Sequence, residues 1–587
     1  MTRHRTLCLL VLAVLTAGLL GAPAALAGKA GDTAYVNGKI FTADAARPMA
    51  QAVVVHNGRI AYVGSTMGAS RYVGAHTKIV NLHGKLVLPG FFDSHTHSSM
   101  TVSMLFSVQL YGMKSVGEYT AEVARFAHDH PEFPNIKGSG WSNTVVPDGG
   151  PLASSLDYIV SDKPVSIMSE DGHSYWVNTK ALALAGITGD TPDPKGGKIE
   201  RIPGTAGTPG NPYGTPSGTL REFPANDLVN NKLADYTVDQ YKQGILSYQA
   251  NVAGPLGITS IFDPLLKVGS NSIQAYEELA RSGQLTMRVR GALSLTPEDD
   301  LSTWIPMAKA ERAKHTTALF RTNAVKFFAD GVIEGHTGYL KKPYKDAFAY
   351  AGDKSYRGTP VWTQAKMTAA FTALDKAGFQ LHVHAIGDAA TTEALNAFAA
   401  ARKANGAHDW RPGITHLQLV DPADFGRFAQ LGVTAFPDPY WFLMDDYYWK
   451  LQLPYLGKYR ADHEYPMKSF FTAGALVASA SDFPVTIPPD PIVGIQTGVM
   501  RWAAGWSIPM KNVLWPAQKV AVRQMIRSFT INGAKADFTD KVAGSLEKGK
   551  SADLIVLGKD LLTVPDVKID TAHVVLTVFQ GKVVYQK

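Results

Sequence analysis

Eight apolar runs of β type alternate with helical patterns along the middle of the chain. They lie at 86–97, 258–263, 287–291, 324–328, 380–385, 414–419, 433–436 and 476–482. Strands that are separated by helices pair in parallel, and eight such units are the number that closes a barrel. The sequence therefore predicts an α/β protein built on a (β/α)8 TIM barrel over residues 86–537.

The gap between the first two runs is too long for a single helical connection. We expect residues from about 101 to 249 to form an insertion after barrel strand 1, with β runs of its own at 137–141 and 165–169. Insertions at the carboxyl ends of barrel strands commonly build the roof of the active site. The insertion is therefore expected to cover the functional site.

Short β runs at both ends of the chain flank this long middle. Their turn signals are Asn37-Gly38, Asn57-Gly58 and Gln580-Gly581. Asn-Gly pairs favour the tight turns of antiparallel hairpins. Residues 28–85 and 538–587 are therefore expected to form one composite β-sandwich from both termini.

Residues 1–27 have the pattern of a secretory signal peptide. A short basic start precedes an apolar run at 7–20, and Ala25 and Ala27 give an Ala-x-Ala cleavage pattern. A membrane anchor is the alternative, but the apolar run is near the lower length limit for spanning a bilayer. We expect cleavage after Ala27, no stable membrane anchor afterwards, and a secreted or periplasmic protein.

The charge and the cysteine content exclude several classes of protein. The net charge is +7, but the 57 basic residues are scattered and form no run typical of a nucleic-acid footprint. The single cysteine, Cys8, lies in the segment that we expect to be removed. The mature chain would then have no thiol, which excludes disulfides, thiolate metal sites and cysteine nucleophiles.

Residues of metal-ligand type end several of the predicted strands. His95 and His97 end the first run, and their spacing places both rings on the same side of a strand. His384, His416 and Asp482 lie at the ends of the fifth, sixth and eighth runs. Because the carboxyl ends of barrel strands meet on one face, we expect these side chains to converge on a metal site. Histidines that are buried for structural reasons are the alternative.

Lys326 is a lone cation among apolar neighbours in the fourth run. A buried charge without a partner is costly, so this position requires a chemical reason. One interpretation is that carbon dioxide carboxylates the amine, giving a carbamate that bridges two cations. The alternative is a salt bridge with Asp330 or another acid.

Six motifs are spread along nearly the whole mature chain. They are Leu88-Pro89-Gly90-Phe91-Phe92-Asp93-Ser94-His95-Thr96-His97, Asp171-Gly172-His173-Ser174, Lys326-Phe327-Phe328-Ala329-Asp330-Gly331, His384-Ala385-Ile386-Gly387-Asp388, Ser481-Asp482-Phe483-Pro484 and the stretch from Gly544 to Leu554. Together they resemble the metal-dependent amidohydrolase superfamily and, within it, amidohydrolase family 3, which includes the N-substituted formamide deformylase type. The resemblance implies a barrel with a composite β-sandwich, one or two divalent metals, usually zinc, and hydrolysis of a C–N bond that is not an ordinary peptide bond.

The resemblance also implies roles for individual residues. The metal ligands would be His95, His97, Lys326 as the bridge, His384, His416 and Asp482. His173, from the insertion, is similar to a histidine that contacts substrate in the family. The role of His382 stays open, because the family motif is anchored on the histidine directly before Ala-Ile-Gly-Asp.

Two positions depart from the family pattern. Gly335-His336-Thr337 stands where many members have a Ser-Arg pair, which puts the polar contacts to the substrate in doubt. Thr415 stands where many members have Glu, which removes a hydrogen-bond partner expected for His416.

These groups predict hydrolysis by a metal-activated water. Asp482 would accept the proton of that water and deliver it to the leaving nitrogen. His173 or His336 would stabilise the oxyanion. A lyase or isomerase on the same barrel, or a binding protein without catalysis, is the alternative.

The stretch 436–459, which follows the seventh run, is dense in aromatic residues and includes Trp441. Aromatic side chains above a barrel favour a small-molecule substrate with an apolar or aromatic group. Packing of the loop, or a subunit interface in a homo-oligomer, is an equal alternative.

Overall fold

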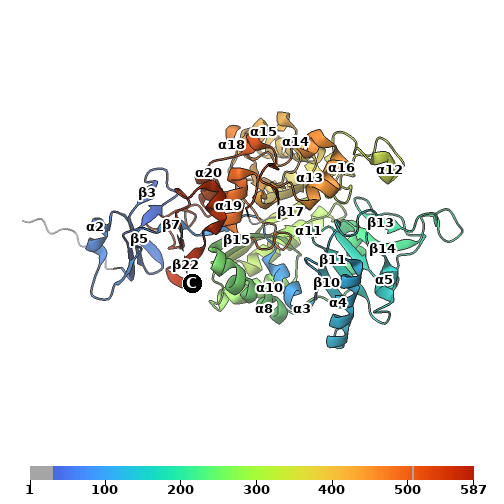
Figure 1. Cartoon of the computed structure of the whole chain (residues 1–587), viewed down its shortest axis with the longest axis horizontal. Coiled ribbons are helices and arrows are strands. Elements are labelled where there is room, and N and C mark those ends of the chain that lie inside the picture. The colour runs from blue at the N-terminus through green and yellow to red at the C-terminus, as the bar shows by residue number, and fades with distance from the viewer. Residues whose placement is uncertain (1–30, 505–507) are drawn as a thin grey trace, which may run out of the picture.

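The computed structural model describes residues 31–504 and 508–587. Three regions follow one another along its long axis (Figure 1): β-sheets from the chain ends, a curled parallel sheet surrounded by helices, and a lobe formed by the insertion. The signal peptide predicted for residues 1–27 lies outside the described residues. Within the described ranges, we find no helix with both the length and the apolar character that a membrane span requires.

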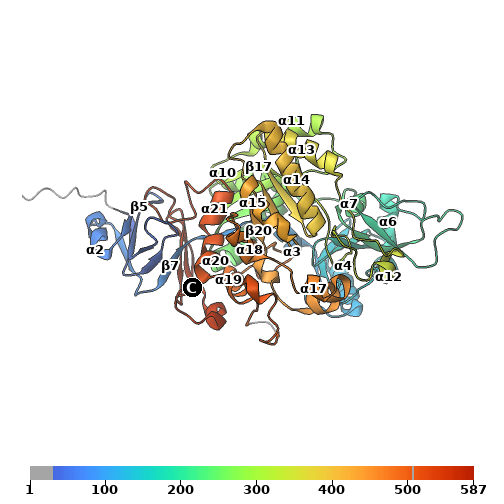
Figure 2. The same ribbon diagram turned by 90° about the horizontal axis from the view of Figure 1, so that it is seen from above.

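A seven-stranded parallel sheet forms the middle region. In sheet order its strands are β8 (Phe91–Asp93), β15 (Ile258–Leu266), β16 (Arg288–Ser294), β17 (Phe320–Phe328), β18 (Gln380–Ala385), β19 (Gly413–His416) and β20 (Thr434–Pro437). Helices follow these strands and cover the outer face of the sheet (Figure 2): α10 (Asn271–Arg281), α11 (Leu301–His315), α13 (Gln364–Lys376), α14 (Asp388–Asn405), α15 (Phe425–Leu431) and α18 (Met467–Thr472). The alternation of strands and helices that the sequence predicted is confirmed for these elements.

The local sequence explains why these segments take their forms. α14 is rich in alanine, the residue with the highest helix propensity, and it ends where Gly406 takes a φ of 85°. Its buried side chains include Leu395, Phe398 and Ala401, which are spaced to share one helix face. This face packs into the large apolar core around the sheet.

The eighth predicted run, 476–482, is not a regular strand. A single parallel bridge joins it to Ala435 of β20. On its other side Ser94, just past β8, donates its backbone N–H to the carbonyl of Ser479. Further along, a side chain takes the place of a backbone partner for Ser481. The carboxylate of Asp93 accepts the N–H of Ser481 at 3.0 Å and the hydroxyl of Ser481 at 2.6 Å. The run therefore lies between β20 and β8 and ends at the carboxyl edge of the sheet.

The first predicted run, 86–97, is divided between two sheets. β7 (Leu86–Pro89) pairs with strands from both chain ends, and β8 begins the curled sheet directly after Gly90. A Cβ at Gly90 would overlap the Thr259 side chain and lie 2.9 Å from its Cβ, so glycine is what lets the two backbones approach this closely. His95 and His97 consequently lie in the turn beyond β8 and not on a strand, which corrects the sequence prediction.

Gly90→Ala is expected to destabilise the protein. The added methyl group would overlap Thr259, whose Cβ cannot rotate away, and such overpacking costs about 1–3 kcal/mol of unfolding free energy. Gly117→Ala in α4 (Val116–Asp129) is the control, because a Cβ there meets only Ser115, at 3.9 Å, and stability should be equal or higher. Urea unfolding measures both variants, and an unchanged midpoint for Gly90→Ala would contradict the packing argument.

The chain ends form two sheets. A six-stranded sheet takes strands from both termini, in the order β23 (Lys582–Gln586), β22 (Val574–Phe579), β21 (Leu554–Leu557), β7, β2 (Lys39–Phe41) and β3 (Met49–Ala50). A four-stranded sheet contains β5 (Arg59–Gly64), β4 (Ala52–His56), β1 (Thr33–Val36) and β6 (Lys78–Asn81). Buried apolar side chains of the two sheets belong to one cluster, so the sheets share a core.

Two of the three predicted hairpin turns join antiparallel strands. Asn57-Gly58 connects β4 to β5 with φ angles of 50° and 72°, and Gln580-Gly581 connects β22 to β23 with 48° and 76°. Positive φ at both positions matches the turn type that right-twisted hairpins favour. Asn37-Gly38 was wrongly expected to close a hairpin, because β1 and β2 lie in different sheets and this turn carries the chain from one sheet to the other.

The insertion forms a lobe with a sheet of its own (Figure 1). The strand order is β13 (Lys198–Arg201), β14 (Pro216–Arg221), β12 (Ser174–Val177), β11 (Val165–Ser169), β10 (Ile136–Trp141) and β9 (Val108–Gln109). Besides α4, the insertion contains the helices α3 (Thr101–Phe106), α5 (Ala153–Asp157), α6 (Thr179–Ala185), α7 (Phe223–Asn230) and α8 (Val238–Tyr248). The two runs predicted inside the insertion are β10 and β11.

Candidate metal centre

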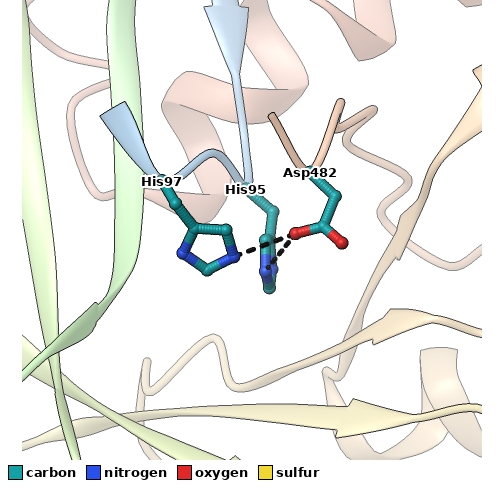
Figure 3. A group of neighbouring side chains, drawn as sticks. All are labelled: His95, His97 and Asp482. Carbon is teal, nitrogen blue, oxygen red and sulfur yellow. Dashed lines mark hydrogen bonds and ion pairs between the residues drawn. The ribbon is translucent and has the colours of Figure 1, made fainter. Parts of the chain in front are cut away.

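His95, His97 and Asp482 meet at the carboxyl end of the curled sheet (Figure 3). Asp482 Oδ1 lies 2.9 Å from His97 Nε2 and 3.2 Å from His95 Nε2. One ligand atom from each residue lies within 4.8 Å of the other two, and all three side chains are buried. Two imidazole nitrogens and a carboxylate oxygen form a donor set that fits Zn²⁺ and other divalent transition metals.

The backbone around this cluster is held in an uncommon conformation. Asp482 has a φ of 56°, and His416 has a φ of 73°, in the left-handed region that residues with a Cβ rarely adopt. Two backbone hydrogen bonds join the turn after β8 to the end of the run 476–482. The N–H of Asp482 donates to the carbonyl of His95 at 2.8 Å, and the N–H of His97 donates to the carbonyl of Phe483 at 2.7 Å. Such strained residues concentrate at functional sites, where the surrounding structure enforces them.

Three further residues predicted as ligands surround this cluster. The ring centroid of His416 lies 5.0 Å from that of His95 and 4.6 Å from that of His384. Lys326 Nζ lies 3.5 Å from His95 Nε2. His384 Nε2 is 3.1 Å from the carbonyl of Gly331, and its buried Nδ1 has no hydrogen-bond partner in the described part of the chain. A buried imidazole nitrogen without a partner fits the role of a metal ligand.

Burial sets the protonation states at this centre. Desolvation and the nearby Lys326 lower the pKa of His95 to about 3, so its imidazole is neutral, as metal binding requires. Burial alone would raise the pKa of Asp482, but hydrogen bonds from His95 and His97 hold it well below its ordinary value. Burial lowers the pKa of Lys326 to about 7, against the opposing charges of Asp482 and Asp438. At neutral pH the site therefore combines a neutral His95 imidazole, an ionised Asp482 carboxylate and a partly deprotonated Lys326 amine.

Lys326 has no acid within salt-bridge distance in residues 31–504 and 508–587. Asp330, the one partner that the alternative interpretation named, instead accepts backbone N–H groups of Tyr339, Ile386 and Gly387 at 2.8–3.0 Å. Asp330 therefore holds the loop after β18 in place and does not neutralise the lysine.

The predicted ligands line one cavity of about 60 Å³. The lining includes His95, His97, Lys326, His384, His416, Asp482 and also His173. Its apolar walls include Met100, Met168, Phe223, Phe328 and Val485, and its polar walls include Tyr111, Glu170 and Asp171. A volume of this size holds a few water molecules or a small group of a ligand. Of these wall residues, Asp171 and Phe328 lie in motifs that the sequence analysis singled out, and the positions of the others carry no motif.

The outer nitrogens of two candidate ligands have buried partners. His95 Nδ1 lies 2.8 Å from His382 Nε2, so His382 lies behind His95 and is not part of the cavity lining. His416 Nδ1 lies 2.8 Å from Asp438 Oδ2. Metal-binding histidines usually hold such a partner on the second nitrogen, which fixes the ring. Asp438 thus supplies the contact that Thr415 cannot, and its place directly after the seventh run is the signal that could have found it.

Asp438→Asn is expected to weaken metal binding by about 10–100-fold while the protein stays folded, because the amide keeps the shape but can turn an N–H group toward His416 Nδ1 and so no longer fixes the ring. Chelator competition measures the metal affinity. Asp375→Asn is the control, since Asp375 holds His408 Nε2 at 2.9 Å outside the cavity lining and should leave the affinity unchanged. Equal affinities of wild type and Asp438→Asn would contradict this role.

The structure brings one of the three candidate substrate-binding residues into the cavity. His173 lies between β11 and β12, and its ring is 4.9 Å from that of His384. Burial alone would lower the pKa of His173, but the Glu222 carboxylate, 2.7 Å from Nδ1, raises it to about 9. The ring is therefore protonated at neutral pH.

The other two candidates lie outside the lining. Trp441 stacks on His416 with centroids 5.4 Å apart, and its indole N–H donates to Thr486 Oγ1 at 3.0 Å. His336 lies 2.8 Å from Asp346 Oδ2 and stacks on Tyr350 at 3.9 Å. Trp441 thus supports a metal-ligand candidate from behind, while His336 belongs to a separate aromatic cluster.

Comparison with known proteins gives consistent matches over most of the chain. The profile of the amidohydrolase family matches residues 78–585. The protein LONG AFTER FAR-RED 3 of Arabidopsis thaliana is 30% identical over 540 residues, which cover 90% of this chain and 88% of that protein. The putative amidohydrolase YtcJ of Bacillus subtilis is 27% identical over 543 residues, covering 92% and 96%. The N-substituted formamide deformylase of Arthrobacter pascens is 25% identical over 575 residues, covering 95% and 98%. A solved metal-dependent hydrolase from Pyrococcus furiosus, itself uncharacterized, has a TM-score of 0.66 and 26% identity over 90% of this chain and 100% of its own.

Proposed function

The chain belongs to the amidohydrolase family, and we propose that it hydrolyses an amide or formamide C–N bond of a small, partly apolar substrate with the help of a divalent metal. The convergence of His95, His97 and Asp482 in one cavity with the other predicted ligands carries this proposal. The apolar walls of the cavity support a substrate with an apolar group. The likeness to N-substituted formamide deformylase supports a formamide.

The donor set favours zinc, because it is rich in histidine. His95, His97 and Asp482 would hold one ion, and His384 and His416 would hold a second. When bound, such a metal polarises a carbonyl group and lowers the pKa of a water molecule. Lys326 would bridge the two ions as a carbamate, formed when its neutral amine bonds to the carbon of CO₂ and releases a proton. Its burial and its lack of an acidic partner among the described residues support this form.

The chain's own side chains would supply the proton transfers and the stabilising contacts. Asp482, ionised at neutral pH, would accept a proton from the attacking water on its carboxylate and return it to the leaving nitrogen. His173, protonated beside Glu222, would donate a hydrogen bond to the oxygen of the substrate as negative charge develops there. Met100, Met168 and Phe223 would exclude water and contact the substrate's apolar part. The N-terminal sequence pattern supports export as the setting in which the enzyme acts.

One experiment tests this proposal directly. Metal content per chain is measured by elemental mass spectrometry, and hydrolysis of a panel of formamides, N-acyl amines and dipeptides is followed before and after chelation. We expect bound metal, and turnover of amides or formamides that is lost on chelation and restored by zinc. Full turnover without metal, or turnover of dipeptides alone, would overturn the proposal.

A further inference from the structure

Glu222 is a buried carboxylate that joins the insertion to the curled sheet. It directly follows β14, is 3% exposed and has a φ of 65°. Its backbone N–H donates to the carbonyl of His173 at 2.8 Å, and Oε2 lies 2.7 Å from His173 Nδ1. Its other oxygen, Oε1, accepts the hydroxyl of Thr337, in the segment that follows β17. Backbone and side chain of one residue thus hold His173 from two sides.

The space for this carboxylate is created by Gly331. A Cβ at Gly331 would overlap both Glu222 Oε1 and Thr337 Oγ1. The backbone carbonyl of Gly331 is at the same time 3.1 Å from His384 Nε2. The segment after β17 therefore contacts a candidate metal ligand and Glu222 together, and it fixes their relative positions.

The hydrogen bond to Glu222 determines which nitrogen His173 can offer to a ligand. Oε1 of Glu222 accepts the Thr337 hydroxyl, and Oε2 lies 2.7 Å from His173 Nδ1, so Nδ1 is the nitrogen that is engaged by the carboxyl group. Nε2 has no hydrogen-bond partner within residues 31–504 and 508–587, and His173 lines the cavity. Nε2 is therefore the atom that remains available to a substrate.

We propose that Glu222 is a positioning residue for hydrolysis: it holds His173 so that Nε2 meets the reacting group of the substrate, and Thr337 and Gly331 hold Glu222 in turn. This inference rests on the function proposed above. The insertion then does more than cover the cavity. It supplies one contact of the reaction, and Glu222 sets the place of that contact relative to the ligands on the sheet.

A double-mutant cycle tests the inference. kcat and KM are measured for wild type, Glu222→Gln, His173→Phe and the double variant on the best substrate of the panel. We expect Glu222→Gln to lower kcat/KM by about 10–100-fold, mainly through kcat. The double variant should be no slower than His173→Phe, because Glu222 acts through His173 and the two losses cannot add. Metal content should be the same in all four proteins.

Two further variants separate positioning from folding. Glu277→Gln removes a carboxylate that holds His315 Nδ1 at 2.5 Å between α10 and α11, outside the cavity lining, and should leave the kinetics unchanged. Glu222→Asp keeps a carboxylate and should recover part of the activity that Glu222→Gln loses. Losses that add in the double variant, or a Glu222→Asp no better than Glu222→Gln, would overturn the inference.

A failure of the proposed hydrolase function can be distinguished from a failure of the positioning inference. If wild type hydrolyses no member of the panel, the hydrolase proposal fails on its own, and crystal structures of wild type and Glu222→Gln then test the positioning. A His173 ring that turns or loses order in the variant supports the inference, and an unchanged ring overturns it.

Discussion

Asp482→Asn is expected to remove nearly all activity and to deplete the bound metal. The asparagine side chain fills the same space but cannot provide an anionic ligand, and it would turn either an amide N–H or a neutral oxygen toward His95 and His97. It also cannot accept the proton of the attacking water. Loss of proton transfer alone lowers rates by about 10²–10⁴-fold, and the loss of metal adds to this. Steady-state kinetics and elemental mass spectrometry on the same preparation measure both effects.

Asp375→Asn is the matched control for this substitution. Asp375 is also a buried aspartate whose Oδ1 contacts a histidine, at 2.9 Å, but it lies on α13 and outside the cavity lining. Wild-type kinetics and metal content are expected for it. A metal content and a kcat/KM for Asp482→Asn close to those of the control would refute both roles of Asp482.

Lys326→Met is expected to abolish activity while it makes the metal-free protein more stable. Burial lowers the pKa of Lys326 from 10.5 to about 7, so between these pH values the unfolded chain binds a proton that the folded chain does not. Stability contributed by the uncharged lysine is therefore present above about pH 10.5 and is lost as the pH falls to about 7. Methionine fills a similar volume and removes this loss.

Urea unfolding of the metal-free wild type and variant at several pH values measures the effect. The stability advantage of Lys326→Met should be largest near neutral pH and should shrink towards pH 10. Metal content and activity should both fall in the variant, and the intact mass of the wild type under native conditions should exceed the sequence mass by one CO₂. A variant that is less stable at pH 7 and keeps its full metal content would show that Lys326 has a structural role.

The sequence predicted the strands of the curled sheet because each is a continuous apolar run next to a helical pattern. The prediction failed where one apolar run is divided between two sheets. Apolar character continues from Leu86 to Phe92, and nothing in it shows that the chain leaves one sheet for another at Gly90. The last run keeps backbone hydrogen bonds to β20, through Leu476, Ala478 and Ala480, but it is not a regular strand. At Ser481 the partner is the Asp93 side chain and not a backbone group.

The candidate ligands could be found because strand ends place them on one face. Their supporting residues could not, because such contacts depend on which loops meet in three dimensions. Glu222 lies in the insertion and Thr337 in another loop, and no spacing rule connects them. His336 was expected above the barrel from its motif position, but its loop directs the ring towards Asp346. Sequence patterns therefore do not predict where the loop residues around the site lie.

The sheet built from both termini has a consequence for the order of synthesis and folding. β7 leads directly into the first strand of the curled sheet, and its neighbour in the other sheet is β21, which pairs with it through Leu554 and Pro89. Because β21 lies near the end of the sequence, it emerges from the ribosome only when translation is nearly complete. Until then one edge of β7 has no partner strand, and an exposed edge invites pairing with other chains. Contacts between such distant segments also form slowly. A chain truncated before β21 would therefore be expected to aggregate rather than to yield a smaller active enzyme.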